Sequence, residues 1–368
     1  MQKMKILEIT VSHRSDDTRI YQKYVKSLLD ADFEVGYIAP DPLINEEPGL
    51  TILPVKKSAY LWARIFGLIK KIPEIRKFNP SFIHLHDPEL LLISPFIRFF
   101  GFKIIYDMHE NFYRELDDKP ISWLSNRSQK LVWRFIEKYI LNKMPVVFAE
   151  ASYAKHFNFI SETMIIQNFP RKKSFSKRYQ PEMIKHDKVK FVYLGTISED
   201  RGAKKMIRSL TRAFGASNFE LNFIGDITDP TLETSLQHVF SKHKNIIFHG
   251  YQSMDDAWNI CKDCDVGLAI LDPKDNYMES YPTKLFEYLI CGLPVITSNF
   301  ELYRGLVEKY NLGLCVNPMS DDEISNALRN IIKEAKYSEF AASIGLFPFH
   351  DFAWEFEFTK FVNYLRRI

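Results

Sequence analysis

The chain has 368 residues, a length that favours about two domains. Hydrophobic residues make up 46% of it and charged residues 26%, which excludes disordered, collagenous and low-complexity proteins. The 49 Lys and Arg residues nearly balance the 46 Asp and Glu residues, so the formal net charge is +3. This balance argues against a dedicated nucleic-acid binder. Four cysteines are too few for a disulfide framework, and we expect a reducing, cytoplasmic compartment.

The first ten residues are typical of a buried strand. They contain no apolar segment and no small-residue cleavage site of the kind found in secretory signals. The longest apolar run, residues 90–102, contains Arg98 and is too short to span a bilayer. We therefore expect no membrane-spanning segment.

Short runs rich in Ile, Val and Phe alternate with longer amphipathic segments, which is typical of βα units around parallel sheets. In the first half the expected strands are residues 5–10, 35–39, 82–86, 103–106 and 146–148. In the second half they are residues 190–194, 221–224, 245–248, 266–270, 294–297 and 313–316. The helix-length segments between them include residues 18–30, 123–141, 204–213 and 321–333.

A polar, basic stretch at residues 168–181 separates the two series and is typical of a linker. It predicts two Rossmann-like domains, residues 1–168 and 169–350. Residues 351–368 form an amphipathic pattern rich in aromatic residues, which predicts a helix that packs back on the first domain. Because ligands bind beyond the carboxyl ends of parallel strands, we expect a cleft between the two sheets.

The segment Glu279-Ser-Tyr-Pro-Thr-Lys-Leu-Phe-Glu287 gives the strongest functional signal. Pro282 suits the first turn of a helix, with Glu279 before it and Glu287 inside it. Free N–H groups at such a helix start suit a phosphate, and the carboxylate of Glu287 can accept hydrogen bonds from a ribose diol. The alternative is a solvated helix with two surface glutamates.

This segment resembles the Glu-x7-Glu element of retaining GT-B glycosyltransferases of family GT4, in particular a subgroup with the motif Ser-x-Pro-x-Lys-Leu-Phe-Glu-Tyr. The resemblance implies a donor nucleotide-sugar site mainly in the second domain and an acceptor site in the first. It implies that Glu279 faces the donor sugar and that Glu287 holds the ribose. The residues that follow Glu279 and contact sugar and diphosphate would be Ser280, Tyr281, Pro282 and Thr283.

Gly195-Thr-Ile-Ser-Glu-Asp-Arg-Gly202 resembles the family segment after the first strand of the second domain. Arg201 holds the position of the basic residue that neutralises the leaving diphosphate; a solvated loop arginine is the alternative. Many relatives carry a second Arg directly after the first glycine, where this chain has Thr196. Three residues remain open as sources of that missing charge: Lys204, Lys205 and Lys284.

Tyr251 follows the expected strand at residues 245–248, beside which the family holds the nucleotide base. It is the candidate residue lining the base, with a packing role as the alternative.

In the first domain, Tyr106-Asp-Met-His-Glu-Asn111 resembles the Asp-x-His-Glu element of part of this family. The resemblance implies that His109 lies near the reacting sugar, where an imidazole can bond a hydroxyl as oxocarbenium character develops. Asp107 and Glu110 are candidates for acceptor contacts. For His84 and His86, at the end of the preceding strand, we favour structural support.

The loop after the first strand contains no glycine and resembles the Asp-Asp-Thr-Arg variant of the same subgroup. Its candidates for contacts with acceptor or phosphate are His13, Arg14, Asp17 and Arg19. A helix-capping role for Asp17 is the alternative.

Nothing in the sequence favours a metal site. Cys261-x-x-Cys264 lacks a second pair at zinc spacing, and Asp226-Ile-Thr-Asp229 is typical of a turn. We therefore expect catalysis without a divalent ion, with basic side chains and a helix dipole in its place.

Residues 56–77 contain seven basic residues against Glu74 alone, interleaved with aromatic and aliphatic residues. A basic amphipathic helix of this kind suits an anionic membrane surface, and a lipid-linked acceptor would then be the natural substrate. The alternative is a surface helix whose apolar side packs on the core.

These features predict a retaining, metal-independent glycosyltransferase that moves a hexosyl or N-acetylhexosaminyl unit from a UDP- or GDP-sugar. The expected acceptor is a saccharide or lipid-linked saccharide of a bacterial surface polysaccharide (capsule or O-antigen), at the inner face of the membrane or in the cytoplasm. A nucleotide-sugar 2-epimerase and a non-catalytic nucleotide-sugar-binding protein are the alternatives. The absence of Gly-x-Gly-x-x-Gly after the first strand disfavours an NAD-dependent oxidoreductase.

Overall fold

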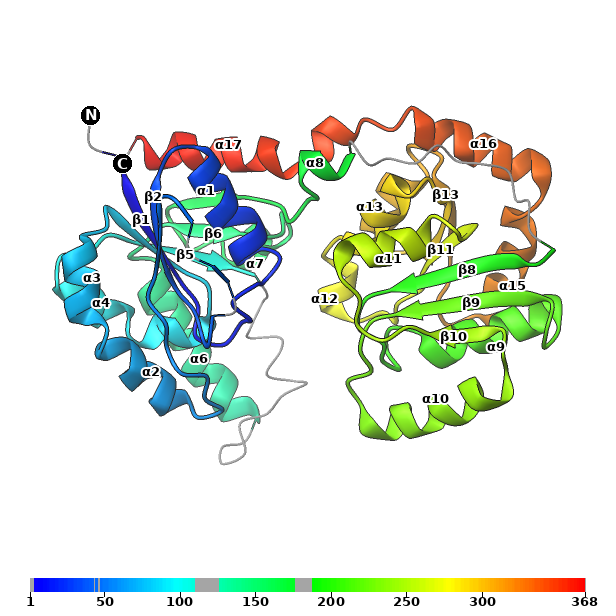
Figure 1. Ribbon diagram of the computed structural model, residues 1–368, viewed down its shortest axis with the longest axis horizontal. Helices are drawn as coiled ribbons and strands as arrows, with labels where there is room; N and C mark the ends of the chain where they lie inside the picture. The colour runs from blue at the N-terminus through cyan, green and yellow to red at the C-terminus, as the bar shows by residue number, and fades with distance from the viewer. Residues whose placement is uncertain (1–2, 43, 46, 110–125, 176–186, 368) are drawn as a thin grey trace. The chain divides into compact units, whose positions relative to one another are not determined.

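The computed structural model describes residues 3–42, 44–45, 47–109, 126–175 and 187–367. The chain forms two compact units, each built on one parallel sheet (Figure 1). The first unit comprises Met1–Asn168 with Trp354–Ile368, and the second comprises Phe169–Ala353.

The sheet of the first unit has seven strands in the order β3-β2-β1-β4-β5-β6-β7. Their bounds are β1 (Lys5–Ile9), β2 (Glu34–Ile38), β3 (Leu50–Ile52), β4 (Phe82–Leu85), β5 (Ile104–Met108), β6 (Val146–Phe148) and β7 (Thr163–Ile165). The five strands expected in this half are present. The sequence analysis missed β3 and β7, three-residue strands at the two edges of the sheet.

Helices cover both faces of this sheet. Leu7 and Ile9 point into a core with α2 (Leu61–Ile69), α3 (Ile72–Phe78), η2 (Pro88–Leu92), α4 (Ser94–Phe99), α6 (Asn126–Leu141) and α7 (Tyr153–His156). Ile6 points to the other face, covered by the π-helix η1 (Ile20–Val25), α1 (Lys26–Asp30) and α17 (Trp354–Leu365). The helix expected at residues 18–30 is therefore a π-helix continued by a short α-helix.

The C-terminal helix α17 returns to the first unit, as the sequence predicts. Trp354 is fully buried there, its ring edge-on to Tyr24, and its Nε1 donates a hydrogen bond of 2.8 Å to Ser27 Oγ. Glu357 of the same helix accepts a bond from the backbone N–H of Gln167.

The second unit contains six strands in the order β10-β9-β8-β11-β12-β13, all of them expected. Their bounds are β8 (Val189–Leu194), β9 (Phe219–Ile224), β10 (Ile246–Phe248), β11 (Val266–Ala269), β12 (Val295–Ser298) and β13 (Gly313–Val316). The helices are α8 (Lys172–Phe175), α9 (Ala203–Phe214), α10 (Pro230–Lys242), α11 (Met254–Cys261), α12 (Asp275–Met278), α13 (Thr283–Ile290), α14 (Glu301–Val307), α15 (Asp321–Ile331), α16 (Glu334–Gly345) and η3 (Phe349–Phe352).

Two cores lie on the two faces of this sheet, one under α9, α10 and α15 and the other under α11 and α13. Cys261, Cys264 and Cys291 are buried in the second of these cores. Asp229 caps α10 through its bond from the N–H of Thr231, as expected for a turn residue. Within the described residues, no helix combines the length and apolarity needed to cross a membrane.

Candidate functional site

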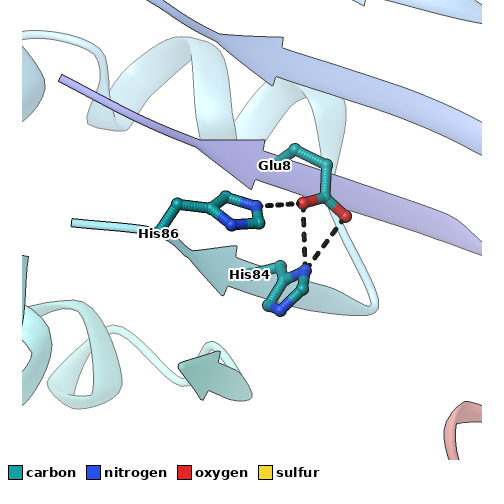
Figure 2. Close-up of side chains that lie close together, drawn as sticks. All are labelled: Glu8, His84 and His86. Carbon is teal, nitrogen blue, oxygen red and sulfur yellow. Dashed lines mark hydrogen bonds and ion pairs between the residues drawn. The ribbon is translucent and has the colours of Figure 1, made fainter. Parts of the chain in front are cut away.

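In the first unit, charged and imidazole groups gather where β4 and β5 end beside β1. The register pairs Glu8 of β1 with His84 of β4, and His86 follows two residues later. Figure 2 shows the carboxylate of Glu8 between the two rings. It accepts hydrogen bonds from Nδ1 of His84, at 3.0 Å, and from Nε2 of His86, and all three side chains are fully buried.

The charges within this cluster are fixed by mutual contact. Burial alone would raise the pKa of Glu8, but His84 and His86 lower it to about 2. Burial alone would lower the pKa of His86, but hydrogen bonds and charges from Asp107 and Glu8 raise it to about 9. At neutral pH, His86 is therefore an imidazolium held between two carboxylates.

Asp107 of β5 connects this cluster to two further groups. Its two oxygens accept hydrogen bonds of 2.9 and 2.8 Å from Nε and an Nη of the buried Arg19, and the same carboxylate accepts from Nε2 of His109 at 2.9 Å. Burial would raise the pKa of Asp107, but Arg19, His109 and His86 hold it well below its usual value. Because Asp107 is fully buried, its role is to position Arg19 and His109 through these hydrogen bonds.

His109 differs from Glu8, His86 and Asp107 in having a partly exposed side chain, 13% accessible. Burial lowers its pKa, and the charges of Arg19 and His86 lower it further, against the opposing effect of Asp107. It is therefore neutral at physiological pH. Nε2 of His109 lies 2.9 Å from Asp107 and 3.1 Å from Nδ1 of His86, so Nδ1 of His109 is the ring nitrogen that can contact a hydroxyl group.

The glycine-free loop after β1 is organised by the buried Asp87. This carboxylate accepts hydrogen bonds from the backbone N–H of Val11 and the hydroxyls of Thr10 and Ser12. Nε2 of His13 lies 3.3 Å from it, and the ring of His13 lies 5.3 Å from that of His109, centroid to centroid. The loop thus brings His13 beside His109.

The other loop candidates have local partners. Arg14 forms a paired contact with Asp16, and Asp17 accepts from the backbone N–H groups of Arg19 and Ile20 at the start of η1. The capping role for Asp17 is therefore confirmed. Glu110 lies outside the described residues.

Among the described residues, two groups of side chains bring metal-ligating atoms within 4.8 Å of one another: Glu8 with His84 and His86, and His86 with Asp107 and His109. Both groups contain His86, whose two nitrogens already lie against Glu8 on one side and Asp107 and His109 on the other. Hydrogen bonding between opposite charges accounts for both arrangements.

In the second unit, the site forms at the carboxyl end of β8. Gly195 has a φ of +112°, and a Cβ there would lie 3.6 Å from Nζ of Lys284. Gly202 has a φ of +79°, and a Cβ there would lie only 2.3 Å from the carbonyl oxygen of Ile270. The two glycines bounding this segment are therefore required by backbone conformation, and at Gly202 also by space.

Lys284, in the first turn of α13, has its ammonium group buried with no hydrogen-bond partner among the described residues. Its Nζ lies 3.7 Å from the centroid of the Tyr193 ring. Burial, together with the nearby charge of Arg201, lowers the pKa of Lys284 well below its usual value, and the carboxylate of Glu287 only partly opposes this. An unpaired buried cation is costly, which points to an anion that binds there.

The two other lysines that could supply the missing charge are already paired. Lys205 bonds Asp272, and Lys204 lies 2.9 Å from Glu199 at the surface. Thr196, in the place where relatives carry Arg, offers its carbonyl to the hydroxyl of Tyr193. Of the three lysines, Lys284 is therefore the one whose ammonium group has no partner among the described residues.

Arg201 is held in place by Tyr277, a residue that the sequence analysis did not identify. Nε of Arg201 donates to the hydroxyl of Tyr277 at 3.3 Å, and that hydroxyl donates to Asp200 at 2.8 Å. Tyr303 in turn bonds the backbone carbonyl of Tyr277. Tyr277 lies two residues before Glu279. An aromatic ring among polar residues so close to that segment was the sequence signal that could have identified it.

The segment between Glu279 and Glu287 has the expected local structure. Pro282 is the N-cap of α13, so Glu279 precedes the helix and Glu287 lies in its second turn. Ser280 Oγ donates to the carbonyl of Asn276, which ties the loop to α12. The ring of Tyr281 packs edge-on against Phe286, Thr283 is exposed at the helix start, and Tyr251 is 62% exposed.

Known proteins resemble this chain in one stretch of its sequence and in its fold. Residues 175–344 match the family described as Glycosyl transferases group 1. No curated protein matches the sequence significantly. Sucrose-phosphate synthase of Thermosynechococcus elongatus aligns over 100% of this chain and 99% of its own, with 15% identity and a TM-score of 0.73.

Two further solved structures show the same likeness. Anabaena Alr3699/HepE in complex with UDP aligns over 100% of both chains, with 13% identity and a TM-score of 0.71. WaaG, a glycosyltransferase involved in lipopolysaccharide biosynthesis, aligns over 93% of this chain and 94% of its own, with 14% identity and a TM-score of 0.68. The two parallel-sheet units thus have the GT-B fold, and the second unit contains the segment that matches the group 1 glycosyl transferases.

Proposed function

We propose that the protein transfers a sugar, with retention of configuration, from a nucleoside-diphosphate sugar to a saccharide acceptor. The buried, unsatisfied ammonium of Lys284 beside Arg201 carries this proposal. Lys284 and Arg201 repel each other in the absence of ligand. A ligand with two adjacent negative charges would stabilise both cations at once. A diphosphate has that charge distribution, and the N–H groups at the start of α13 add donors for it.

The second unit would hold the donor. Lys284 and Arg201 stabilise the charge that develops on the diphosphate as it leaves. Glu287 accepts from the ribose hydroxyls, and Glu279 faces the donor sugar. The two cations and the dipole of α13 take the place of a divalent ion.

The first unit would handle the acceptor. The bond between the anomeric carbon and the diphosphate oxygen breaks while a bond to the acceptor oxygen forms on the same face of the sugar. A diphosphate oxygen takes the proton from the acceptor hydroxyl. Neutral His109 accepts a hydroxyl of the sugar through Nδ1, a contact that strengthens as positive charge grows on the ring.

Both the nature of the donor and the pathway are part of the proposal. HepE is a neighbour described in complex with UDP and with UDP-glucose, and WaaG is described as acting in lipopolysaccharide biosynthesis. We therefore propose a UDP- or GDP-sugar donor, with a saccharide or lipid-linked saccharide of a bacterial surface polysaccharide as acceptor.

The test measures thermal shifts with UDP-, GDP-, ADP- and dTDP-sugars, followed by turnover of the donor that binds. The expected result is binding by wild-type protein in the presence of a chelator and acceptor-dependent release of nucleoside diphosphate. Conversion of the donor to an isomer without acceptor would identify an epimerase, and tight binding without turnover would identify a binding protein. Either result would refute the transfer reaction.

A further inference from the structure

The first unit exposes large apolar side chains on helices that share one face of its sheet. Because α2, α3, η2, α4 and α6 pack inward on the same core, their outer sides belong to one surface. In Figure 1, α2, α3, α4 and α6 lie on the side of the sheet away from α1 and α17. The exposed residues on them, here called the aromatic face, are Tyr60, Trp62, Phe66, Leu92, Phe96, Phe99, Leu131, Phe135 and Tyr139.

The core does not require these side chains. On α2, Ile65 and Leu68 fill the inner side and are buried, while Trp62 and Phe66 point outward and are 66% and 60% exposed. Trp62 and Phe66 are four residues apart, so they lie on one side of the helix. The helix is thus apolar on its inner side and aromatic on its outer side.

The neighbouring helices repeat this arrangement. On α4, Ile97 is buried, whereas Phe99 is 84% exposed. On α6, Leu131, Phe135 and Tyr139 follow one another at four-residue spacing and are all exposed. Large exposed apolar side chains that gather on the helices of one sheet face are typical of an interaction site.

The charges around the aromatic face have one sign. Its exposed basic residues on or flanking the same helices are Lys56, Lys57, Lys70, Arg76, Lys77, Arg98, Arg134, Lys138 and Lys143. The acidic residues described on these helices are paired or buried: Glu74 bonds Lys71, Glu89 bonds Arg64, and Glu137 is buried and accepts from Trp133.

We propose that the aromatic face binds the surface of a membrane that contains anionic lipids. Aromatic rings partition into the interface between headgroups and acyl chains, and the surrounding Lys and Arg residues attract the anionic headgroups. Within the described residues, the acidic groups on these helices are paired or buried, so the basic residues around the aromatic face are complementary to such a surface. The proposal goes beyond sugar transfer, because binding of a lipid surface needs neither donor nor acceptor.

The test is sedimentation of the full-length protein with vesicles of phosphatidylcholine, with and without about one third phosphatidylglycerol. Wild-type protein is expected to bind the anionic vesicles and to dissociate at high salt. The double variant Trp62→Glu/Phe66→Glu should bind at least tenfold more weakly. The triple variant Lys56→Glu/Lys57→Glu/Lys70→Glu should bind these vesicles at least a hundredfold more weakly, because loss of each basic residue weakens partition about fivefold and the added carboxylates are repelled.

The matched control is Met319→Glu/Leu346→Glu, which adds the same charges at exposed apolar positions of the second unit. It should bind vesicles like the wild type, and thermal melting should show all four proteins folded. Equal binding by the control and the Trp62/Phe66 variant, or absence of binding by wild-type protein, would overturn the proposal. A concentration-dependent dimer that the Trp62/Phe66 variant abolishes, without vesicle binding, would also overturn it, because a second copy would then cover this face.

Discussion

Replacement of Lys284 by Met should change stability and donor binding in opposite directions. The side chains are similar in volume, but Met removes an ammonium group that is buried without a partner among the described residues. Replacement of buried ionic groups by apolar residues stabilises proteins by about 1–4 kcal/mol, so the melting temperature should rise by several degrees. A charge-assisted hydrogen bond contributes about 1.5–3 kcal/mol, so the dissociation constant for nucleoside diphosphate should rise roughly 10- to 150-fold.

The pH dependence follows from the lowered pKa of Lys284. Between that pKa and the usual value of Lys, the unfolded chain binds more protons than the folded protein, so this group makes stability rise with pH. The stabilisation by Met should therefore be largest at low pH and vanish above about pH 10.4, the usual pKa of Lys. Above the folded pKa, diphosphate binding should take up a proton, visible as buffer-dependent heat in calorimetry.

The control is Lys204→Met, which changes a surface lysine paired with Glu199. It should alter neither the melting temperature nor nucleotide affinity by more than a small amount. If Lys284→Met lowered the melting temperature and left nucleotide affinity unchanged, the ammonium would be a structural group, and the reasoning about the anion site would be wrong.

Three further changes test the remaining assignments. Glu287→Ala should weaken nucleotide binding about tenfold or more in a thermal-shift titration, and unchanged affinity would remove it from the ribose site. His109→Ala should lower kcat much more than it raises KM for the donor; a pure KM effect would contradict a role in the transition state. His86→Gln should raise the pKa of His109 and move the acidic limb of the pH–rate profile upward, which a purely structural role would not do. In wild-type protein the pKa of His86 is raised from 6.5 to about 9, because the folded protein stabilises the imidazolium. This shift corresponds to roughly 3 kcal/mol of folding free energy. The stabilisation is fully present below pH 6.5 and is lost as the pH rises through 9. The His86→Gln variant should lack this decline in urea melts between pH 6.5 and 9.

The sequence predicted the parallel sheets because buried parallel strands appear as apolar runs. It missed β3 and β7 because edge strands of three residues carry too few buried side chains to form such a run. Glu8 was also missed, although a glutamate within an apolar strand was a signal. Its role depends on the register that sets it opposite His84, which is a property of the folded sheet.

The choice among three lysines likewise needed the structure. Lys205 pairs with Asp272, which is 67 positions away in the chain, and no local spacing shows such a contact. The segment around Lys284 predicted the start of a helix correctly, because Pro282 and the apolar residues after it determine that locally. Burial of the ammonium group depends on Tyr193 of strand β8, which is 91 positions away in the chain, so only the folded structure shows it.

The helix that ends the chain has a consequence for synthesis. Tyr24 and Ser27 are covered by Trp354, which is synthesised 327 positions after Ser27. During synthesis the first unit therefore keeps an apolar surface exposed until α17 has been made, whereas the second unit can fold before that. The first unit is therefore completed only after the second unit has been translated, and a fragment that stops after Asn168 would lack α17 and be prone to aggregate.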